Sequence, residues 1–143
     1  EMTALFSGWR IEIVATDLSQ AVLEKSRAGL FSQFEVQRGL PIHLLVKYFA
    51  QKGELWQLNA DIRSMVQHRQ LNLLQDISHL GTFDVIFCRN VMIYFDAPTQ
   101  RKVLERIHGV MKPKGLLFVG HSENFTESRD LFSLKGKTVY DKV

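Results

Sequence analysis

Three polar side chains that could take part in chemistry, Arg89, Asn90 and Tyr94, follow the short apolar run 85–88. We expect this run to be a strand buried on both faces of a parallel sheet. In open α/β sheets, ligands bind at the carboxyl ends of the strands, which is where these side chains stand. A guanidinium can hold an acidic group through a charge-assisted hydrogen bond, and a phenol can orient that group. The pattern predicts a site for an acidic substrate.

A carboxylate, Asp17, ends a second strand that the sequence predicts at 11–16, after a weakly patterned lead-in. Ser19 is expected to cap a helix over 20–28, and Gly29 is expected to end it. In nucleotide-binding βαβ units, a carboxylate at this position accepts hydrogen bonds from ribose hydroxyls. The alternative is a solvated turn aspartate beside a cap, and this stretch taken alone favours that alternative.

Two further positions have structural alternatives. Asn72 lies inside the apolar tetrad 71–74, where its amide could pair with the edge of a base or cap a turn. Cys88 closes the buried run 85–88, and a buried thiol usually packs as a small hydrophobic group rather than acting as a nucleophile.

Other catalytic arrangements are disfavoured. Neighbouring residues on an extended chain point apart, so the run His121-Ser122-Glu123 would not form a hydrolase relay, and no GxSxG motif is present. The five histidines are scattered and the single cysteine has no metal-ligand spacing, so no metal site is expected.

The elements between these sites predict an insertion. A helix is expected from Pro41 to about residue 51, followed by two short antiparallel strands at 54–59 and 64–68. Such a pair does not belong to a plain doubly wound sheet, so we expect a small β insertion at about 52–70. It could be a docking surface or a flap that covers a sheet edge.

The second half of the chain returns to a βα pattern. A helix is expected over 98–111, with Pro98 at its start, and a buried strand at 116–120. The last strand, around 134–140, is reached without a crossover helix and should run antiparallel to its neighbour. The predicted fold class is α/β, with a mainly parallel sheet and an antiparallel last strand.

The composition is that of an ordinary globular domain. The chain has 143 residues, 45% hydrophobic and 23% charged, with a net charge of +3 and no run of Lys and Arg that would indicate a nucleic-acid partner. No apolar stretch reaches the roughly 18 residues of a membrane span. One cysteine fits a reducing compartment, so we expect a cytoplasmic protein without membrane insertion.

Group transfer is the chemistry that these positions suit best. Asp17 would hold a ribose, Asn72 a base, and the polar residues after 85–88 would line the reacting end. Methyl transfer from a sulfonium to a carboxylate needs little acid–base help, because the carboxylate is already ionised near neutral pH and the leaving group is neutral. Alignment and the shielding of charge would then carry catalysis.

The segments FDVIFCRNVMIYF at 83–95 and LFVGHSENF at 117–125 closely resemble the chemotaxis receptor methyltransferases of the CheR family. The segments at 39–41, 72–74 and 132–140 are similar to the same family, so the resemblance covers nearly the whole chain from about residue 11.

The resemblance implies a Rossmann-like class I methyltransferase fold. It implies S-adenosylmethionine as the cofactor, S-adenosylhomocysteine as its product, and methyl esterification of glutamate side chains on chemoreceptor cytoplasmic domains in chemotaxis signal transduction. The resemblance also implies a role for each residue that matches a functional position of the family. The implied catalytic residues are Arg89 and Tyr94, and the implied cofactor-binding residues are Asp17, Asn72, Leu73, Cys88, Arg89 and Asn90. The β insertion matches a subdomain that docks a receptor tail in some members of the family.

The chain departs from the family pattern at its start. The basic helical domain and the first strand with its glycine-containing loop are not found, so residues 1–143 resemble the C-terminal part of the catalytic domain. Without that strand we expect an unpaired gap or two exposed strand edges, weak or no activity, and a possible dimer formed by strand exchange. The alternatives are a non-catalytic module that docks receptor or signalling partners, and a methyltransferase with another substrate.

Overall fold

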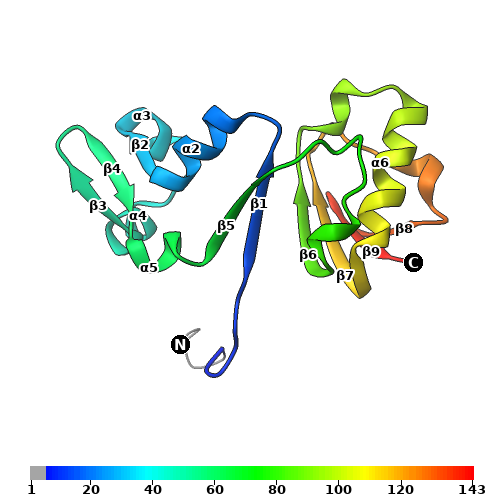
Figure 1. Ribbon diagram of the computed structural model, residues 1–143, viewed down its shortest axis with the longest axis horizontal. Helices are drawn as coiled ribbons and strands as arrows, with labels where there is room; N and C mark the ends of the chain where they lie inside the picture. Colours follow the sequence, from blue (N-terminus) through cyan, green and yellow to red (C-terminus); the bar gives the residue numbers. More distant parts are fainter. Residues whose placement is uncertain (1–5) are drawn as a thin grey trace. The chain divides into compact units, whose positions relative to one another are not determined.

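The computed structural model describes residues 6–143, and the chain divides into two compact units, Glu1–Asn72 and Leu73–Val143. Figure 1 labels the helices and strands of both. Residues 1–5, half of the predicted lead-in, lie outside the described residues.

The first unit contains a parallel pair of strands, β1 (Ile13–Asp17) and β5 (Val66–Gln70). Helix α2 (Gln20–Ala28) follows β1 and buries Leu23. The Ser19 hydroxyl accepts a backbone N–H of the first turn at 3.3 Å, and the glycine at position 29 ends the helix with a φ of 62°. The predicted helix, its cap and its end are confirmed, because all three depend on local chemistry.

An antiparallel sheet completes this unit, in the order β2 (Leu30–Ser32), β4 (Leu55–Leu58) and β3 (Phe49–Lys52). Strands β3 and β4 form a hairpin that turns at Gly53, whose φ is 62°. Three short helices accompany the sheet: α3 (Gln33–Gln37), α4 (Ile42–Tyr48) and α5 (Ala60–Arg63).

The predicted pairing of 54–59 with 64–68 is wrong. The second segment overlaps β5, which pairs in parallel with β1, while β4 pairs with β2 and β3. Residues 49–52, predicted as the end of a helix, are a strand because the glycine turn at 53 folds them back onto β4. The antiparallel sheet therefore extends over residues 30–58, earlier in the chain than the insertion expected at 52–70.

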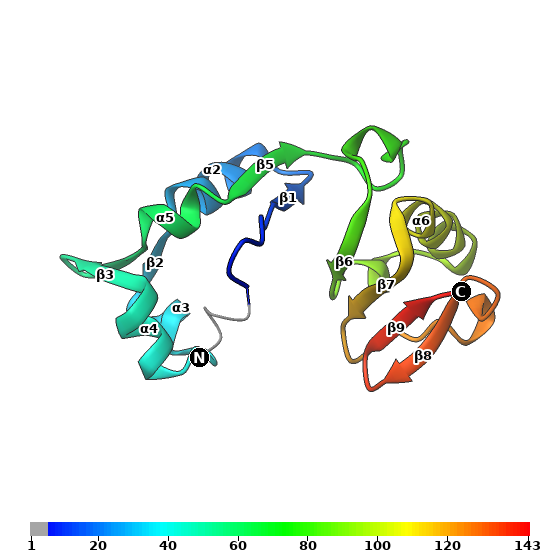
Figure 2. The same cartoon turned by 90° about the horizontal axis from the view of Figure 1, so that it is seen from below.

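The second unit is a four-stranded sheet in the order β6 (Phe83–Cys88), β7 (Met111–Val119), β9 (Val139–Lys142) and β8 (Phe132–Gly136). Figure 2 shows these strands side by side. Strands β6 and β7 are parallel, and β9 runs antiparallel to β7, which confirms the prediction for the end of the chain. Three single 3₁₀ turns lie in the connections: η1 (Ser78–Leu80), η2 (Met92–Tyr94) and η3 (Thr126–Ser128).

Helix α6 (Ala97–Gly109) crosses over between β6 and β7. Asp96 caps it by accepting the N–H of Thr99 at 2.9 Å, and Pro98 lies in the first turn as predicted. At its other end, the ammonium of Lys142 donates to the carbonyls of His108 and Met111 at 2.8 and 2.6 Å. A cation at this end of a helix satisfies unpaired carbonyls and complements the helix dipole.

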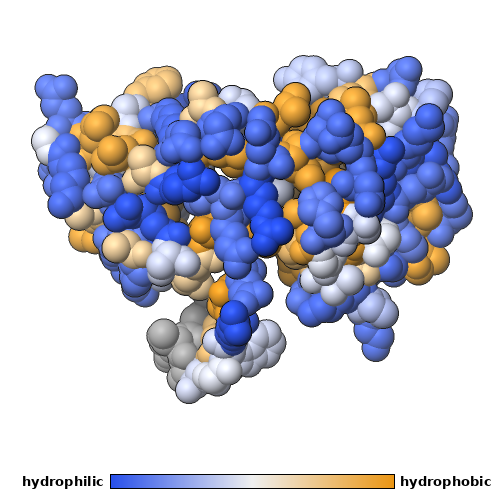
Figure 3. Space-filling model, viewed as in Figure 1, coloured by the Kyte–Doolittle hydropathy of each residue, from blue (hydrophilic) through white to orange (hydrophobic). Residues whose placement is uncertain are grey.

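Strand β6 is buried on one face only, which corrects the prediction of burial on both. Cys88 lies on the covered face, beside the fully buried Val119. On the other face, Val85 is 43% exposed and Phe87 is 70% exposed, with the Phe87 ring stacked on Phe118. Figure 3 shows hydrophobic residues at the surface of both units. Apolar composition predicted burial here, but Val85 and Phe87 remain exposed.

The sequence led us to expect exposed strand edges, and the structure has them. Among residues 6–143, β1 is hydrogen-bonded to one neighbouring strand, and β6 likewise to one. No helix in this part of the chain is long and apolar enough to cross a membrane.

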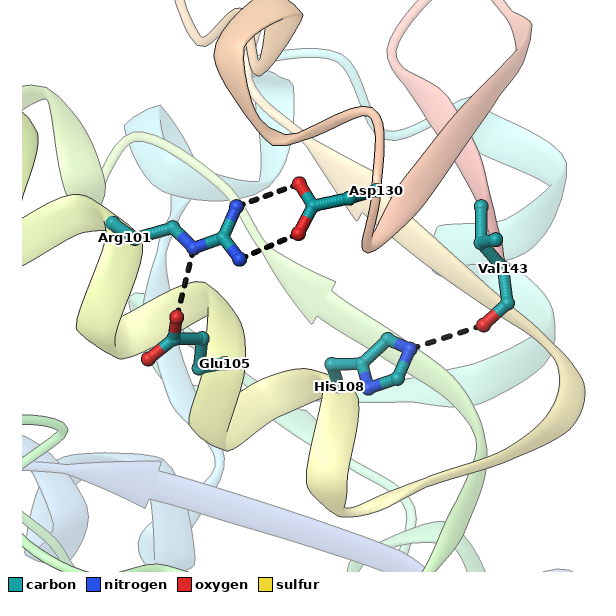
Figure 4. A network of polar contacts seen from close by, with 5 residues as sticks. All are labelled: Arg101, Glu105, His108, Asp130 and Val143. Atoms are coloured by element: carbon teal, nitrogen blue, oxygen red, sulfur yellow. Dashed lines mark hydrogen bonds and ion pairs between the residues drawn. The ribbon is translucent and has the colours of Figure 1, made fainter.

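A network of charges joins α6 to the segment before β8 (Figure 4). The Arg101 guanidinium donates two hydrogen bonds of 2.6 Å to the Asp130 carboxylate and one of 2.8 Å to Glu105. These bonds hold the pKa of Asp130 below its usual value and raise the pKa of Arg101. Beside them, His108 Nε2 lies 3.1 Å from the Val143 carbonyl oxygen.

Asp130→Asn should flatten the acid limb of the stability curve. Because the folded pKa lies below the ordinary value of about 3.9, the ionised pair stabilises the folded state fully above that value. The contribution is lost as the pH falls through the folded pKa. The measurement is the urea midpoint as a function of pH. Arg101→Gln should flatten the curve in the same way, and an Asp130→Asn curve parallel to that of the unmodified chain would contradict the assignment.

Candidate functional site

In the first unit, Asp17 and Asn72 lie at the same end of the β1–β5 pair. Asp17 is the last residue of β1, its backbone carbonyl accepts the N–H of Leu71 at 2.9 Å, and Asn72 comes next. The side chain of Gln70 donates to the Leu18 carbonyl at 2.9 Å and ties the two strand ends together. Asp17 ends its strand as predicted, whereas the position of Asn72 after a strand parallel to β1 was not predicted.

The half-buried carboxylate of Asp17 has one oxygen engaged and one available. Its Oδ1 accepts the backbone N–H of Ser19 at 2.8 Å, which is the turn arrangement considered as the structural alternative. Among the described residues, Oδ2 accepts no hydrogen bond. The turn therefore uses only Oδ1 of Asp17, and Oδ2 can accept a hydrogen bond from a ligand hydroxyl.

In the second unit, Cys88, Arg89 and Asn90 stand together where β6 ends. Burial, with a smaller contribution from the Glu123 carboxylate, raises the pKa of the Cys88 thiol to about 11. The thiol therefore stays protonated near neutral pH, which supports packing rather than nucleophilic attack. The guanidinium of Arg89 is exposed and pairs with no carboxylate of the described residues.

The backbone after β6 takes an uncommon conformation. Asn90 has a φ of 58°, in the left-handed region that non-glycine residues rarely adopt. Beyond it, Met92 is fully buried and anchors the turn η2, whereas the Tyr94 side chain is 81% exposed. The buried Met92 side chain thus holds the turn in place, and the phenol of Tyr94, two residues later, is exposed.

One side chain that was not assigned to the site, Glu123, organises this backbone. Its Oε1 accepts the N–H groups of Val91 and Met92 at 3.1 and 2.8 Å. Its Oε2 accepts those of Asn90 and Gly120 at 3.0 and 2.6 Å. The sequence places Glu123 in a polar cluster after β7, and that position at a strand end was the signal that could have identified it.

Two neighbours complete the arrangement. A Cβ at Gly120 would lie 2.2 Å from Asn90 Oδ1, so only glycine lets the two strand ends approach this closely. In addition, the amide of Gln100 donates to the carbonyls of Met92 and Phe95 at 2.9 and 3.1 Å. An open depression of about 310 Å³ adjoins the segment; its lining is Ile93, Gln100, Ser122, Glu123, Asn124 and Phe125.

Leu73 is the remaining predicted residue. It is half-buried at the start of the second unit, and its carbonyl accepts a hydrogen bond of 3.2 Å from Arg106 on α6. No group of three or more His, Cys, Asp or Glu side chains among the described residues is placed to hold a metal ion.

Comparisons with known proteins cover nearly the whole chain. A family model described as "CheR methyltransferase, SAM binding domain" matches residues 1–140. Chemotaxis protein methyltransferase 1 of Pseudomonas aeruginosa is 45% identical over 125 residues, covering 87% of this chain and 46% of the relative. The chemotaxis protein methyltransferase of Escherichia coli is 41% identical over 135 residues, covering 92% of this chain and 47% of the relative.

The chain spans about half the length of the curated relatives it matches. Among solved structures, PKMT2 from Rickettsia typhi in complex with AdoHcy aligns with a TM-score of 0.48 and 19% identity. The alignment covers 76% of this chain and 15% of the Rickettsia protein.

Cys88, the one cysteine of the chain, should react slowly with iodoacetamide in the folded protein. With its pKa at about 11 against an ordinary value of 9.0, the thiolate fraction at pH 8 is about 100-fold smaller than in urea. The folded-state rate should keep rising with pH toward pH 11, as followed by mass spectrometry. Equal rates with and without urea at pH 8 would show that the thiol is neither buried nor shifted.

Proposed function

Because the chain belongs to the CheR methyltransferase family, we propose that it is part of an enzyme that methylates glutamate side chains of chemoreceptors. The family's domain binds S-adenosylmethionine, which was the cofactor expected from the sequence motifs. The product would be S-adenosylhomocysteine, and the reaction would take place in the cytoplasm, on the cytoplasmic domains of the receptors.

One observation carries the catalytic part of the proposal. Arg89 and Tyr94 are exposed and project from a backbone segment that several hydrogen bonds hold in place. We assign to Arg89 the pairing with a carboxylate, since its guanidinium has no partner among the described residues. Tyr94 would donate its phenolic hydrogen to the acceptor glutamate and so orient the attacking oxygen.

The residues present fit the chemistry of the cofactor. When bound, S-adenosylmethionine supplies a methyl group on a positively charged sulfur. Asp17 offers a free carboxylate oxygen for ribose hydroxyls, and we assign Asn72 and Leu73 to the adenine side. Cys88 and Asn90 complete the proposed cofactor contacts. A neutral thiol at Cys88 suits contact with a ligand that must not be attacked, and its raised pKa keeps it in that form.

The reaction needs alignment more than acid–base help. The acceptor carboxylate is ionised near neutral pH, and the departing thioether is neutral. No proton has to leave the acceptor before the new bond forms. The tasks left to the chain are holding the acceptor in line and compensating its charge, which Arg89 and Tyr94 can perform.

Two partner assignments extend the proposal. The outer edge of β3 is unpaired among the described residues, so a receptor tail could add to the β2–β4–β3 sheet as a further strand. The open edges of β1 and β6 could pair with those of a second copy, giving a strand-exchanged dimer. Light scattering over a range of concentrations would reveal such a dimer, and a monomer throughout would exclude it.

Calorimetric titration of S-adenosylhomocysteine tests the cofactor site. We expect tight binding to the longer chain that matches the full length of the relatives, and weak or no binding to residues 1–143 alone. Asp17→Asn should weaken binding by about 10- to 100-fold, because a charged hydrogen bond contributes about 1.5–3 kcal/mol.

Asp61→Asn is the matched control, since Asp61 is an exposed carboxylate on α5 outside the proposed site. If neither length of chain binds, the domain is a docking module and the enzymatic proposal fails. If Asp17→Asn binds as well as the unmodified chain, the ribose assignment fails alone.

Tyr94→Phe in the longer chain should lower kcat for methylation of a receptor cytoplasmic domain about tenfold, because one orienting hydrogen bond is removed from the acceptor. Initial rates with radiolabelled methyl donor give the value. Tyr48→Phe on α4 removes a hydroxyl elsewhere and should leave kcat unchanged. Equal rates for Tyr94→Phe and the unmodified enzyme would remove the phenol from the mechanism.

A further inference from the structure

We infer that Glu123 is a positioning residue for methyl transfer, whose carboxylate fixes the backbone that carries Asn90 and Tyr94. This inference rests on the proposed function. Glu123 is 7% exposed and receives four backbone N–H groups from two strand ends. The proposed contacts with substrate and cofactor do not involve this buried carboxylate.

The four hydrogen bonds account for the burial of the charge. A carboxylate taken out of water is costly unless its oxygens are fully hydrogen-bonded. Glu123 forms no ion pair with any cation of the described residues, so backbone N–H dipoles supply the compensation. Each oxygen accepts two of these groups, and the segment after β6 contributes three of the four.

The geometry is that of an anion-binding nest. Asn90 is left-handed, Val91 is right-handed, and the successive N–H groups from Asn90 to Met92 converge on one carboxylate. Such concavities usually receive a phosphate or another external anion. Here the chain fills the nest with its own side chain, so the left-handed conformation of Asn90 depends on Glu123.

The same segment is held by a second side chain. Gln100 donates to the carbonyls of Met92 and Phe95, so both donors and acceptors of the segment are engaged. The absence of a side chain at Gly120 lets the two strand ends meet. The backbone is therefore fixed while the Tyr94 ring stays exposed, which is the arrangement needed to aim a phenol at a substrate.

A direct chemical role for Glu123 does not fit these contacts. Both of its oxygens are committed to backbone N–H groups, and the side chain is almost entirely covered. The acceptor glutamate is already ionised, so the reaction calls for no general base. Glu123 therefore acts through the segment that it holds.

The test is Glu123→Gln in the full-length enzyme. Glutamine keeps the shape but replaces one oxygen with an amide NH₂ group, which cannot accept backbone N–H groups. We expect kcat per folded molecule to fall about 100-fold, as for a displacement of about 1 Å in a catalytic group. The KM for the receptor domain should change little, because Glu123 is covered. Hydrogen exchange should accelerate at the amides of residues 90–92.

Val103→Ala is the control for a purely structural effect. Val103 is fully buried on α6 and makes no hydrogen bond to the segment 90–95, so its truncation lowers the melting temperature without releasing that segment. Both variants are assayed well below their melting temperatures, with the folded fraction measured by circular dichroism. Val103→Ala should keep the kcat of the unmodified enzyme.

Gln100→Leu provides a second variant if Glu123→Gln does not fold. It removes the two hydrogen bonds to the carbonyls of Met92 and Phe95 from a half-buried position, and should also lower kcat while KM for the receptor domain is kept. The inference is overturned if the folded Glu123→Gln enzyme keeps its kcat within twofold, or, where that variant does not fold, if Gln100→Leu does so. It is also overturned if the loss of kcat follows melting temperature equally in all variants. An unmodified full-length enzyme that transfers no methyl group would instead overturn the proposed function.

Discussion

The carboxylate of Glu123 links the ends of two parallel strands whose approach would otherwise leave backbone N–H groups unpaired. Parallel strands pair their backbone N–H and C=O groups along their length. The loops that follow their carboxyl ends have no neighbouring strand to pair with. In the second unit, one side chain after β7 meets the N–H groups of the loop after β6 and of its own strand end. Together with the Gln100 amide, this carboxylate holds the backbone that carries the exposed polar residues of that loop.

In the first unit, the carboxyl end of a strand is held by different contacts. The end of β1 is held by its own turn, in which Asp17 accepts the Ser19 N–H, and by the contact of its carbonyl with Leu71. No buried charge is involved among the described residues of this unit. Local turn chemistry is therefore sufficient at one strand end, whereas the other requires a side chain from more than thirty residues away along the sequence.

Local signals in the sequence predicted local structure well. Ser19, Gly29 and Pro98 mark helix ends correctly, because capping and first-turn preferences depend on residues within one turn. The pairing of β5 with β1 escaped prediction, since the partners are separated by a complete antiparallel sheet and only folding brings them together. Phe87 was misjudged because an apolar residue in a strand indicates a face that can be buried and does not tell whether anything covers it.

In the candidate site too, features set by neighbouring residues could be predicted and contacts between distant residues could not. The polar residues after β6 could be found from their type and their place after an apolar run. The place of Glu123 at a strand end could be found in the same way, but its contacts could not. Acceptance of backbone N–H groups leaves no pattern in the sequence of the donors, since Val91 and Met92 are apolar residues that contribute only their main chain.

The contact of Lys142 with the end of α6 links the order of synthesis to the order of folding. The helix is made well before β9, yet the carbonyl of His108 in its last turn acquires its cationic partner only when residue 142 has been added. Until then β7 also lacks its antiparallel neighbour β9. The last contact of the helix and the last strand pairings of the sheet therefore both depend on residues 139–142, which are made at the end of the second unit.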